Sequence, residues 1–163
     1  MFSKSGLRWG TRKVIEYCPY LQTNMRVWLI SLLFLSLMGI TGCTTAPEAR
    51  KAASLSVSRF HEEFNAEQYD QIYDESDARF KSTESKKDLT VFLTSIHQKL
   101  GKSGNTKEEN SLVYTTQGGM IVNLRYQTQF GNALAHENFT FFVDHDHATL
   151  VGYNLQSPEF FEK

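Results

Sequence analysis

Hydrophobic residues in the middle of this chain recur with the period of an α-helix. Ala53, Val57, Phe60 and Phe64 follow one another at steps of four, three and four residues. This spacing gathers side chains on one stripe of a helix and leaves the remaining faces polar. The pattern therefore predicts an amphipathic helix over residues 48–65.

A second, shorter helix is predicted directly after the first. Asn65 stands where an N-cap is expected, and Gln68 follows three residues later, in the capping-box position. Tyr69, Ile72 and Tyr73 then have the spacing of an inner helical face.

The clearest helical pattern occupies residues 86–100. Ser85 is its predicted N-cap, and Gly101 supplies the stop that commonly follows a helix. Between the second and third helices, residues 75–84 are polar except for Phe80, and we predict a loop there. The apolar stripe of the third helix consists of Leu89, Phe92, Leu93, Ile96 and Leu100.

Beyond Gly101 the hydrophobic pattern alternates from one residue to the next, as in a β-strand. Strands are predicted over residues 111–116, 120–130, 135–143 and 149–156, and an earlier segment over 102–109 also fits the pattern. The intervening turns contain Gly118-Gly119, Gly131-Asn132 and Asp144-His145-Asp146-His147. Strands joined by such short turns form an antiparallel meander.

The two faces of this sheet differ in polarity, so helices are expected on one side only. The sequence therefore predicts an α+β domain in which three helices pack on one face of a curved four-stranded antiparallel meander. The apolar face contains Leu112, Tyr114, Val122, Leu124, Tyr126, Phe130, Phe139, Phe141, Val143, Val151, Tyr153 and Leu155. The polar face contains Asn123, Arg125, Gln127, Gln129, His136, Asn138, Thr140, Asn154 and Gln156.

The region before the first helix contains an apolar run with the features of a secretory signal peptide. Arg26 follows Met25, and the run from Val27 to Met38 ends at Gly39. A positive start and an apolar core of about 7–15 residues are typical of such a signal, whereas a spanning helix needs about 20 apolar residues. We interpret residues 25–42 as the signal peptide. Residues 1–24 are either an upstream mis-start of translation or a long positive extension of the signal.

The end of the signal, Ile40-Thr41-Gly42-Cys43, resembles the lipobox of bacterial lipoproteins. The resemblance implies cleavage after Gly42 and acylation of Cys43, which would attach the protein to a lipid bilayer. Residues 43–47 are then the lipidated cysteine and a tether, and residues 158–163 form a tail. Because Thr44 rather than Asp follows the cysteine, the resemblance implies the outer membrane, facing the periplasm, in a Gram-negative organism. A cysteine that ends a signal anchor is the alternative.

Removal of residues 1–42 changes the charge balance of the chain. The full sequence has 17 Lys and Arg against 18 Asp and Glu, while residues 43–163 keep 12 of the former and 17 of the latter. A net charge of −5 argues against nucleic acid as a partner, because phosphate binding needs clustered Lys and Arg. Cys43 is the sole cysteine in this part, so no disulfide is expected.

The order of helices and strands over residues 48–157 resembles the nuclear transport factor two-like, or cystatin-like, superfamily, and small uncharacterised bacterial lipoproteins with such a cone-like domain. The strand segments that carry the resemblance are Tyr126-x-Thr128-x-Phe130-Gly131-Asn132, Glu137-x-Phe139-x-Phe141 and Gly152-Tyr153-x-Leu155. The resemblance implies a pocket between helices and sheet in catalytic members, and an open sheet face that forms dimers or binds partners in others.

Candidate residues for both uses are present. Tyr69, Tyr73, Tyr126 and Tyr153 are predicted to line the cavity or to fill the core. Since we assign no Asp, Glu or His to the inward strand face, a general base is expected to be missing. The predicted interaction face consists of Asn123, Arg125, Gln127, His136, Asn138 and Asn154, with an ordinary solvated face as the alternative.

No metal site or cofactor is predicted. His61-Glu62 and His136-Glu137 both lack the second histidine of a zinc-protease helix. The segment Asp144–His147 is interpreted as a hairpin turn rather than a cation site. The sequence thus favours a membrane-anchored envelope lipoprotein with a non-catalytic ligand- or protein-binding domain, as a homodimer or with an envelope partner. The alternative is an enzyme that uses the cavity on a small apolar substrate.

Overall fold

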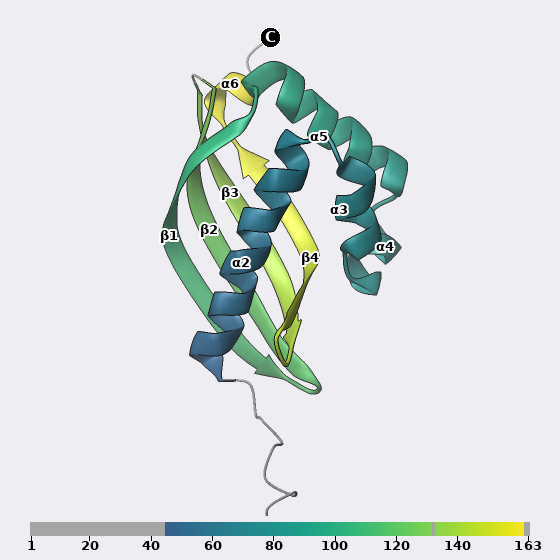
Figure 1. Cartoon of the computed structure of the whole chain (residues 1–163), viewed down its shortest axis with the longest axis vertical. Coiled ribbons are helices and arrows are strands. Elements are labelled where there is room, and N and C mark those ends of the chain that lie inside the picture. The colour runs from purple at the N-terminus through teal and green to yellow at the C-terminus, as the bar shows by residue number, and fades with distance from the viewer. Residues whose placement is uncertain (1–44, 132, 162–163) are drawn as a thin grey trace, which may run out of the picture. The chain divides into compact units, whose positions relative to one another are not determined.

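Helices come first and strands second in the part of the chain that the structure describes, residues 45–131 and 133–161 (Figure 1). The structure is a computed structural model. The predictions for the signal peptide, for Gly42 and for Cys43 concern residues outside these ranges. None of the helices that the structure describes is long and apolar enough to cross a bilayer.

The described chain is an α+β domain with a single four-stranded sheet. The strands are ordered β1-β2-β3-β4, and each pair of neighbours is antiparallel, as predicted for a meander. The elements are α2 (Ala46–Asn65), α3 (Tyr69–Glu75), α4 (Ala78–Thr83), α5 (Lys86–Leu100), β1 (Ser103–Thr116), β2 (Gly119–Phe130), β3 (Ala133–Asp144), β4 (His147–Gln156) and α6 (Pro158–Phe161).

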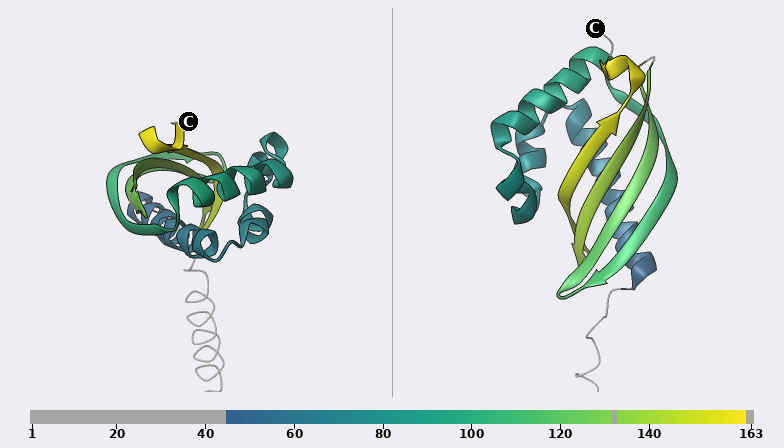
Figure 2. Two further views of the ribbon diagram at one scale, coloured as in Figure 1. Left: turned by 90° about the horizontal axis from the view of Figure 1, so that it is seen from above. Right: turned by 180° about the vertical axis from the view of Figure 1, so that it is seen from behind.

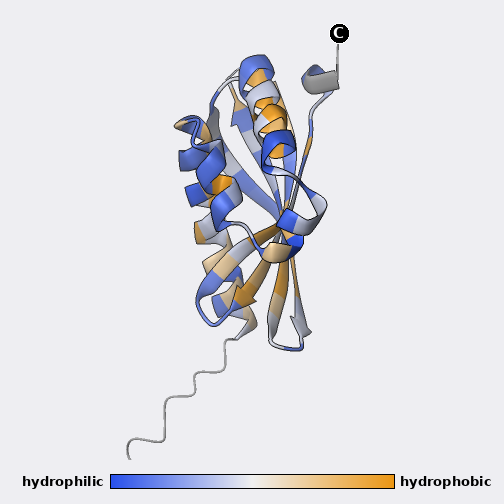
Figure 3. Ribbon diagram, turned by 90° about the vertical axis from the view of Figure 1, so that its right-hand side faces the viewer, coloured by the Kyte–Doolittle hydropathy of each residue, from blue (hydrophilic) through white to orange (hydrophobic). Residues whose placement is uncertain are grey.

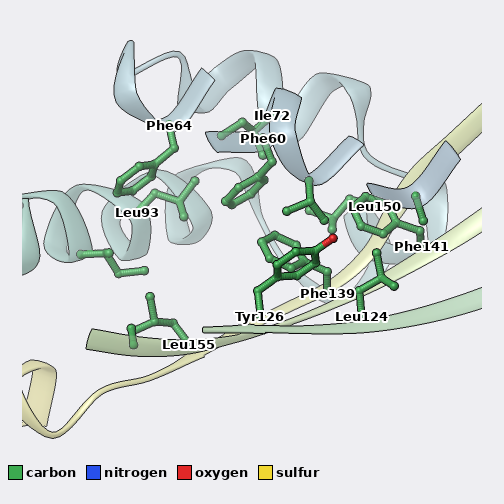
Figure 4. Close-up of a cluster of buried hydrophobic side chains, with 14 of the residues drawn as sticks. Phe60, Phe64, Ile72, Leu93, Leu124, Tyr126, Phe139, Phe141, Leu150 and Leu155 are labelled. Atoms are coloured by element: carbon green, nitrogen blue, oxygen red, sulfur yellow. The ribbon is translucent and has the colours of Figure 1, made fainter. Parts of the chain in front are cut away.

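Seen along the domain, the sheet is curved, and α2 lies against its concave side (Figure 2, left). Polar and apolar residues alternate along the helices (Figure 3), because each helix turns its apolar stripe toward the core. The stripe predicted for the first helix, Ala53 to Phe64, is buried in α2, and Leu89, Leu93, Ile96 and Leu100 are buried in α5. These side chains meet Leu124, Phe139, Phe141 and Leu155 of the sheet in one core (Figure 4).

The helical region contains one more helix than predicted. Residues 75–84, predicted to be a loop, contain α4, which buries Phe80. Asp77 caps it by accepting a hydrogen bond from the backbone N–H of Arg79 (2.9 Å). The N–H of Asp77 donates to the carbonyl of Leu150 (2.9 Å), so tertiary contacts with β4 hold a helix too short to be stable alone.

Asn65 does not cap the second helix. It is the last residue of α2, and its side chain bridges to the start of β1, accepting from the N–H of Ser103 (2.8 Å) and donating to the Ser103 carbonyl (2.9 Å). Gln68 is the N-cap residue of α3, without a side-chain cap hydrogen bond. The amide of Asn65 thus ties the helical layer to the sheet.

The first strand is longer than the predicted segment and has the opposite phase at its end. Leu112 and Tyr114, assigned to the apolar face, are 49% and 50% exposed, whereas Val113 packs against the core. The cause is an irregularity in β1: Glu108 pairs with Tyr126 and Asn110 with Arg125, so Glu109 is an extra residue. Such a bulge reverses the alternation beyond it.

Candidate functional site

The six residues of the predicted interaction face lie together on the outer, convex side of the sheet. Strand register places Arg125 opposite Asn138, Gln127 opposite His136, and Asn138 opposite Asn154. Asn123 lies one alternate step from Arg125 on the same strand. Among the described elements, no helix crosses this face, which is turned toward the viewer in Figure 2, right.

The charged groups on the outer face neutralise one another. One oxygen of Glu109, Oε2, accepts from Nε of Arg125 (3.1 Å) and lies 2.9 Å from Nδ1 of His136. Burial raises the pKa of Glu109, but the hydrogen bonds and charges of His136 and Arg125 outweigh it and hold the pKa below its ordinary value. Glu109 was not among the predicted site residues, because only the bulge turns it outward.

The neutral amide side chains at the centre of the face have fewer hydrogen-bond partners than its charged groups. Asn123 accepts a hydrogen bond from the Thr140 hydroxyl (2.8 Å). Within residues 45–131 and 133–161, the side chains of Asn110, Asn138 and Asn154 make no hydrogen bond, so their donors and acceptors are open to a partner.

A shallow hollow of about 270 Å³ lies over Asn110, Asn123 and Asn138. Leu112 borders it, with Tyr114 two residues further along the same face of β1. The hollow is formed by Asn110, Leu112, Asn123, Leu124, Arg125, Asn138, Phe139 and Thr140. A surface with open amides and two exposed apolar side chains can bind a partner by hydrogen bonds and by burial of apolar area.

The four tyrosines predicted to line a cavity do not converge on one. Tyr69 packs on Phe64, and Tyr73 packs on Phe80. Tyr126 and Tyr153 both pack on Phe139. A cavity of about 60 Å³ lies between α2, α3 and β4, but other residues form it, among them Arg59 and Glu63. That volume suits one or two water molecules rather than an organic substrate.

The expectation that the inward strand face carries no acid is wrong. Glu137 of β3 faces the helices and has no exposed surface. Its Oε2 lies 2.8 Å from Nε2 of His61 on α2, and its Oε1 accepts from the Tyr153 hydroxyl (2.6 Å). Glu137, Phe139 and Phe141 are alternate residues of β3, so their side chains lie on the same face of the sheet. Strand alternation alone therefore predicts that Glu137 faces inward.

His61 also lies on the buried stripe of its helix, four residues after Val57 and three before Phe64. The rings of Phe60 and Phe139 flank it edge-on, so the carboxylate and the imidazole meet in an apolar setting. Burial first, then the charge and hydrogen bond of Glu137, raise the pKa of the Tyr153 hydroxyl well above its ordinary range. Tyr153 is therefore a hydrogen-bond donor to Glu137 at neutral pH.

Cation ligands are not assembled in the described part of the chain, which contains no group of three His, Cys, Asp or Glu side chains suited to a metal ion. The segment Asp144–His147 forms the β3–β4 turn, with His145 in the left-handed region (φ 56°). His147 and Asp146 side chains are about nine-tenths exposed.

A scan of this chain against protein-family models and a search of curated proteins both find no match.

Proposed function

We propose that this chain is a lipid-anchored cell-envelope protein whose domain is a non-catalytic binding module. Cys43 carries the acyl chains, and in a Gram-negative organism the domain faces the periplasm from the outer membrane. The outer sheet face is the binding surface. The first partner that we propose is a second copy of the chain. The observation that carries this proposal is the set of open amides around Asn138 in a hollow of the uncovered sheet.

Self-pairing fits the chemistry of this face. A two-fold interface places one patch against itself, so the patch must be self-complementary. Amides meet this condition because each is both a donor and an acceptor. Like charges do not oppose it, since Glu109 already compensates Arg125 within one copy. Leu112, Tyr114 and Leu134, about half exposed, add apolar area that a partner would bury.

The proposal is tested by a charge placed in the centre of the face. In Asn138→Lys, two like charges would approach each other across the symmetry axis, and the dissociation constant should rise by about tenfold or more. Sedimentation velocity of the detergent-solubilised lipoprotein measures this. Ser58→Lys, on the exposed side of α2, is the matched control and should leave association unchanged. A wild-type protein that stays monomeric at all concentrations would exclude self-pairing.

A second candidate function is catalysis, which the pair of His61 and Glu137 favours. A carboxylate hydrogen-bonded to an imidazole is the arrangement of many general bases. It ranks second because both oxygens of Glu137 are occupied and the carboxylate is sealed from solvent by the aromatic core. A substrate would have to displace either His61 or Tyr153 to reach it.

A further inference from the structure

The structure assigns a bilayer-facing end to the domain: the start of α2 together with the β1–β2 and β3–β4 turns. The inference rests on the proposed lipidation of Cys43. It adds which surface meets the phospholipid headgroups, and therefore how the domain stands on the membrane.

The first step is where the rigid domain begins. Thr45 is the N-cap of α2, and its backbone N–H and hydroxyl both donate to Oε2 of Glu48 (2.8 and 2.9 Å). The Thr45 carbonyl accepts from the N–H of Ala49 (2.9 Å). Ala49 and Ala53 have no exposed surface, so the first turns of α2 are fixed to the sheet. The tether predicted over residues 43–47 is therefore shorter, since Ala46 and Pro47 are already helical.

The second step is covalent reach. Consecutive Cα atoms are about 3.8 Å apart, so the Cα of Thr45 lies within about 8 Å of that of Cys43 whatever the conformation of Thr44. The headgroup layer on each side of a bilayer is about 5–8 Å thick. An acylated Cys43 would therefore keep the start of α2 at the headgroup surface.

The third step is what else lies at that end. Both hairpin turns lie at the end of the domain where α2 begins (Figures 1 and 2). The contact between the Ser56 hydroxyl and the Ala148 carbonyl (3.2 Å) joins α2 to β4 just after the β3–β4 turn. The β2–β3 turn and the end of α5 lie at the opposite end, where the N–H of Gly131 donates to the Lys102 carbonyl (3.1 Å).

The chemistry of this end fits contact with headgroups rather than insertion between acyl chains. The two turns present Gln117, Asp144, His145, Asp146 and His147, all exposed and polar. The acidic groups give no attraction to anionic lipid, so the tether and not electrostatics sets the orientation. The orientation should therefore persist in high salt and in zwitterionic vesicles.

Energy transfer to a headgroup-labelled lipid tests the inference in the lipidated protein reconstituted in phosphatidylcholine vesicles. The processed chain has no other cysteine, so Gln117→Cys, Asp146→Cys and Gln98→Cys can each carry one donor dye. We expect transfer from positions 117 and 146 to exceed that from position 98 several-fold. Insertion of about 20 Gly and Ser residues before Thr45, with a mean span of about 25 Å, should remove most of this difference.

The outcomes separate the two proposals. If the protein floats with the vesicles but energy transfer from positions 117 and 146 is equal to or lower than that from position 98, the proposed orientation is wrong. The proposed lipid anchor is then still supported. Protein that does not float with vesicles would overturn lipidation, and the orientation with it. The use of two near positions guards against a variant that does not fold, which near-ultraviolet circular dichroism would reveal.

Discussion

At the scale of single residues, Glu137 shows how the core accommodates a buried acidic side chain. Its carboxyl group is hydrogen-bonded to His61 of α2 and to Tyr153 of β4. Three elements therefore meet at one buried side chain. A buried carboxylate is tolerated only when its lone pairs are satisfied, and removal of one partner leaves the others unpaired.

Substitutions at this position should separate pairing from charge. Glu137→Ala leaves His61 and Tyr153 without a partner beside a cavity, and we expect a loss of about 3–5 kcal/mol in the free energy of unfolding. Glu137→Gln keeps one acceptor and one donor, so it should cost about 1–2 kcal/mol. Urea unfolding followed by circular dichroism measures both. Gln98→Ala on the exposed side of α5 is the control and should change stability by less than about 0.5 kcal/mol. Equal losses in the two Glu137 variants would contradict the role assigned to the hydrogen bonds.

At the scale of elements, single polar contacts hold short segments to the sheet. Asp77 caps α4 and also accepts from the Thr149 hydroxyl of β4 (3.1 Å). Arg79 donates to both oxygens of Asp77 and lies with its guanidinium carbon 4.0 Å from the centre of the Phe142 ring. The hydrogen bond from Arg79 is the largest influence on Asp77, whose pKa falls from an ordinary 3.8 to about 2.

This pKa makes the attachment of α4 sensitive to acid. Because the pKa of Asp77 is lower in the folded chain, its contribution to stability is present above about pH 4 and is lost as the pH falls through about 2. We expect Asp77→Asn to cost about 1–2 kcal/mol at pH 7 and to flatten the dependence of stability on pH between about 4 and 2. Urea titrations at several pH values check this. An unchanged slope in the variant would argue against Asp77 as the titrating group.

The turn between β2 and β3 is a second point where elements meet. Gly131 has a φ of 48°, and a Cβ there would lie 2.8 Å from the carbonyl oxygen of Leu100 at the end of α5. Gly118 also has positive φ (93°), but its added Cβ would meet open space. Gly131→Ala should therefore destabilise the domain by about 1–2 kcal/mol more than Gly118→Ala. Thermal unfolding of the two variants compares them, and equal losses would show that conformational strain alone matters.

The elements also show how far the sequence could be interpreted. The α5 stripe and the alternation of β2 and β3 are long, regular patterns, so their predicted bounds differ from the structure by two residues at most. Helix α4 was missed because contacts with β4, distant in sequence, stabilise it. The phase of β1 was wrong beyond Glu109, since a bulge has no signature in alternation alone. Glu137 was missed because no acid was assigned to the inward strand face, although Glu137 alternates in step with Phe139 and Phe141.

At the scale of the whole molecule, we expect the proposed attachment at Cys43 and the folding of the domain to be separable. Within residues 45–131 and 133–161, the buried side chains form one core that draws on every helix from α2 to α5 and on the inner face of the sheet. We expect Cys43→Ala to abolish partitioning into the detergent phase of a phase separation. The variant should keep the unfolding midpoint of the lipidated protein, because the residues that the structure describes already pack into one core. A variant that still enters the detergent phase would contradict lipidation at this cysteine.

Glu109 has no partner residue in the β1–β2 strand register, and this has a consequence for how the chain could change by mutation. Since Glu108 and Asn110 already pair with consecutive residues of β2, deletion of Glu109 would leave every strand pair in place. The same deletion would remove the carboxylate that compensates Arg125 and His136. A one-codon loss could thus make the outer face cationic without altering the fold. The charge of this face can therefore change without a change in the pairing of the strands that carry it.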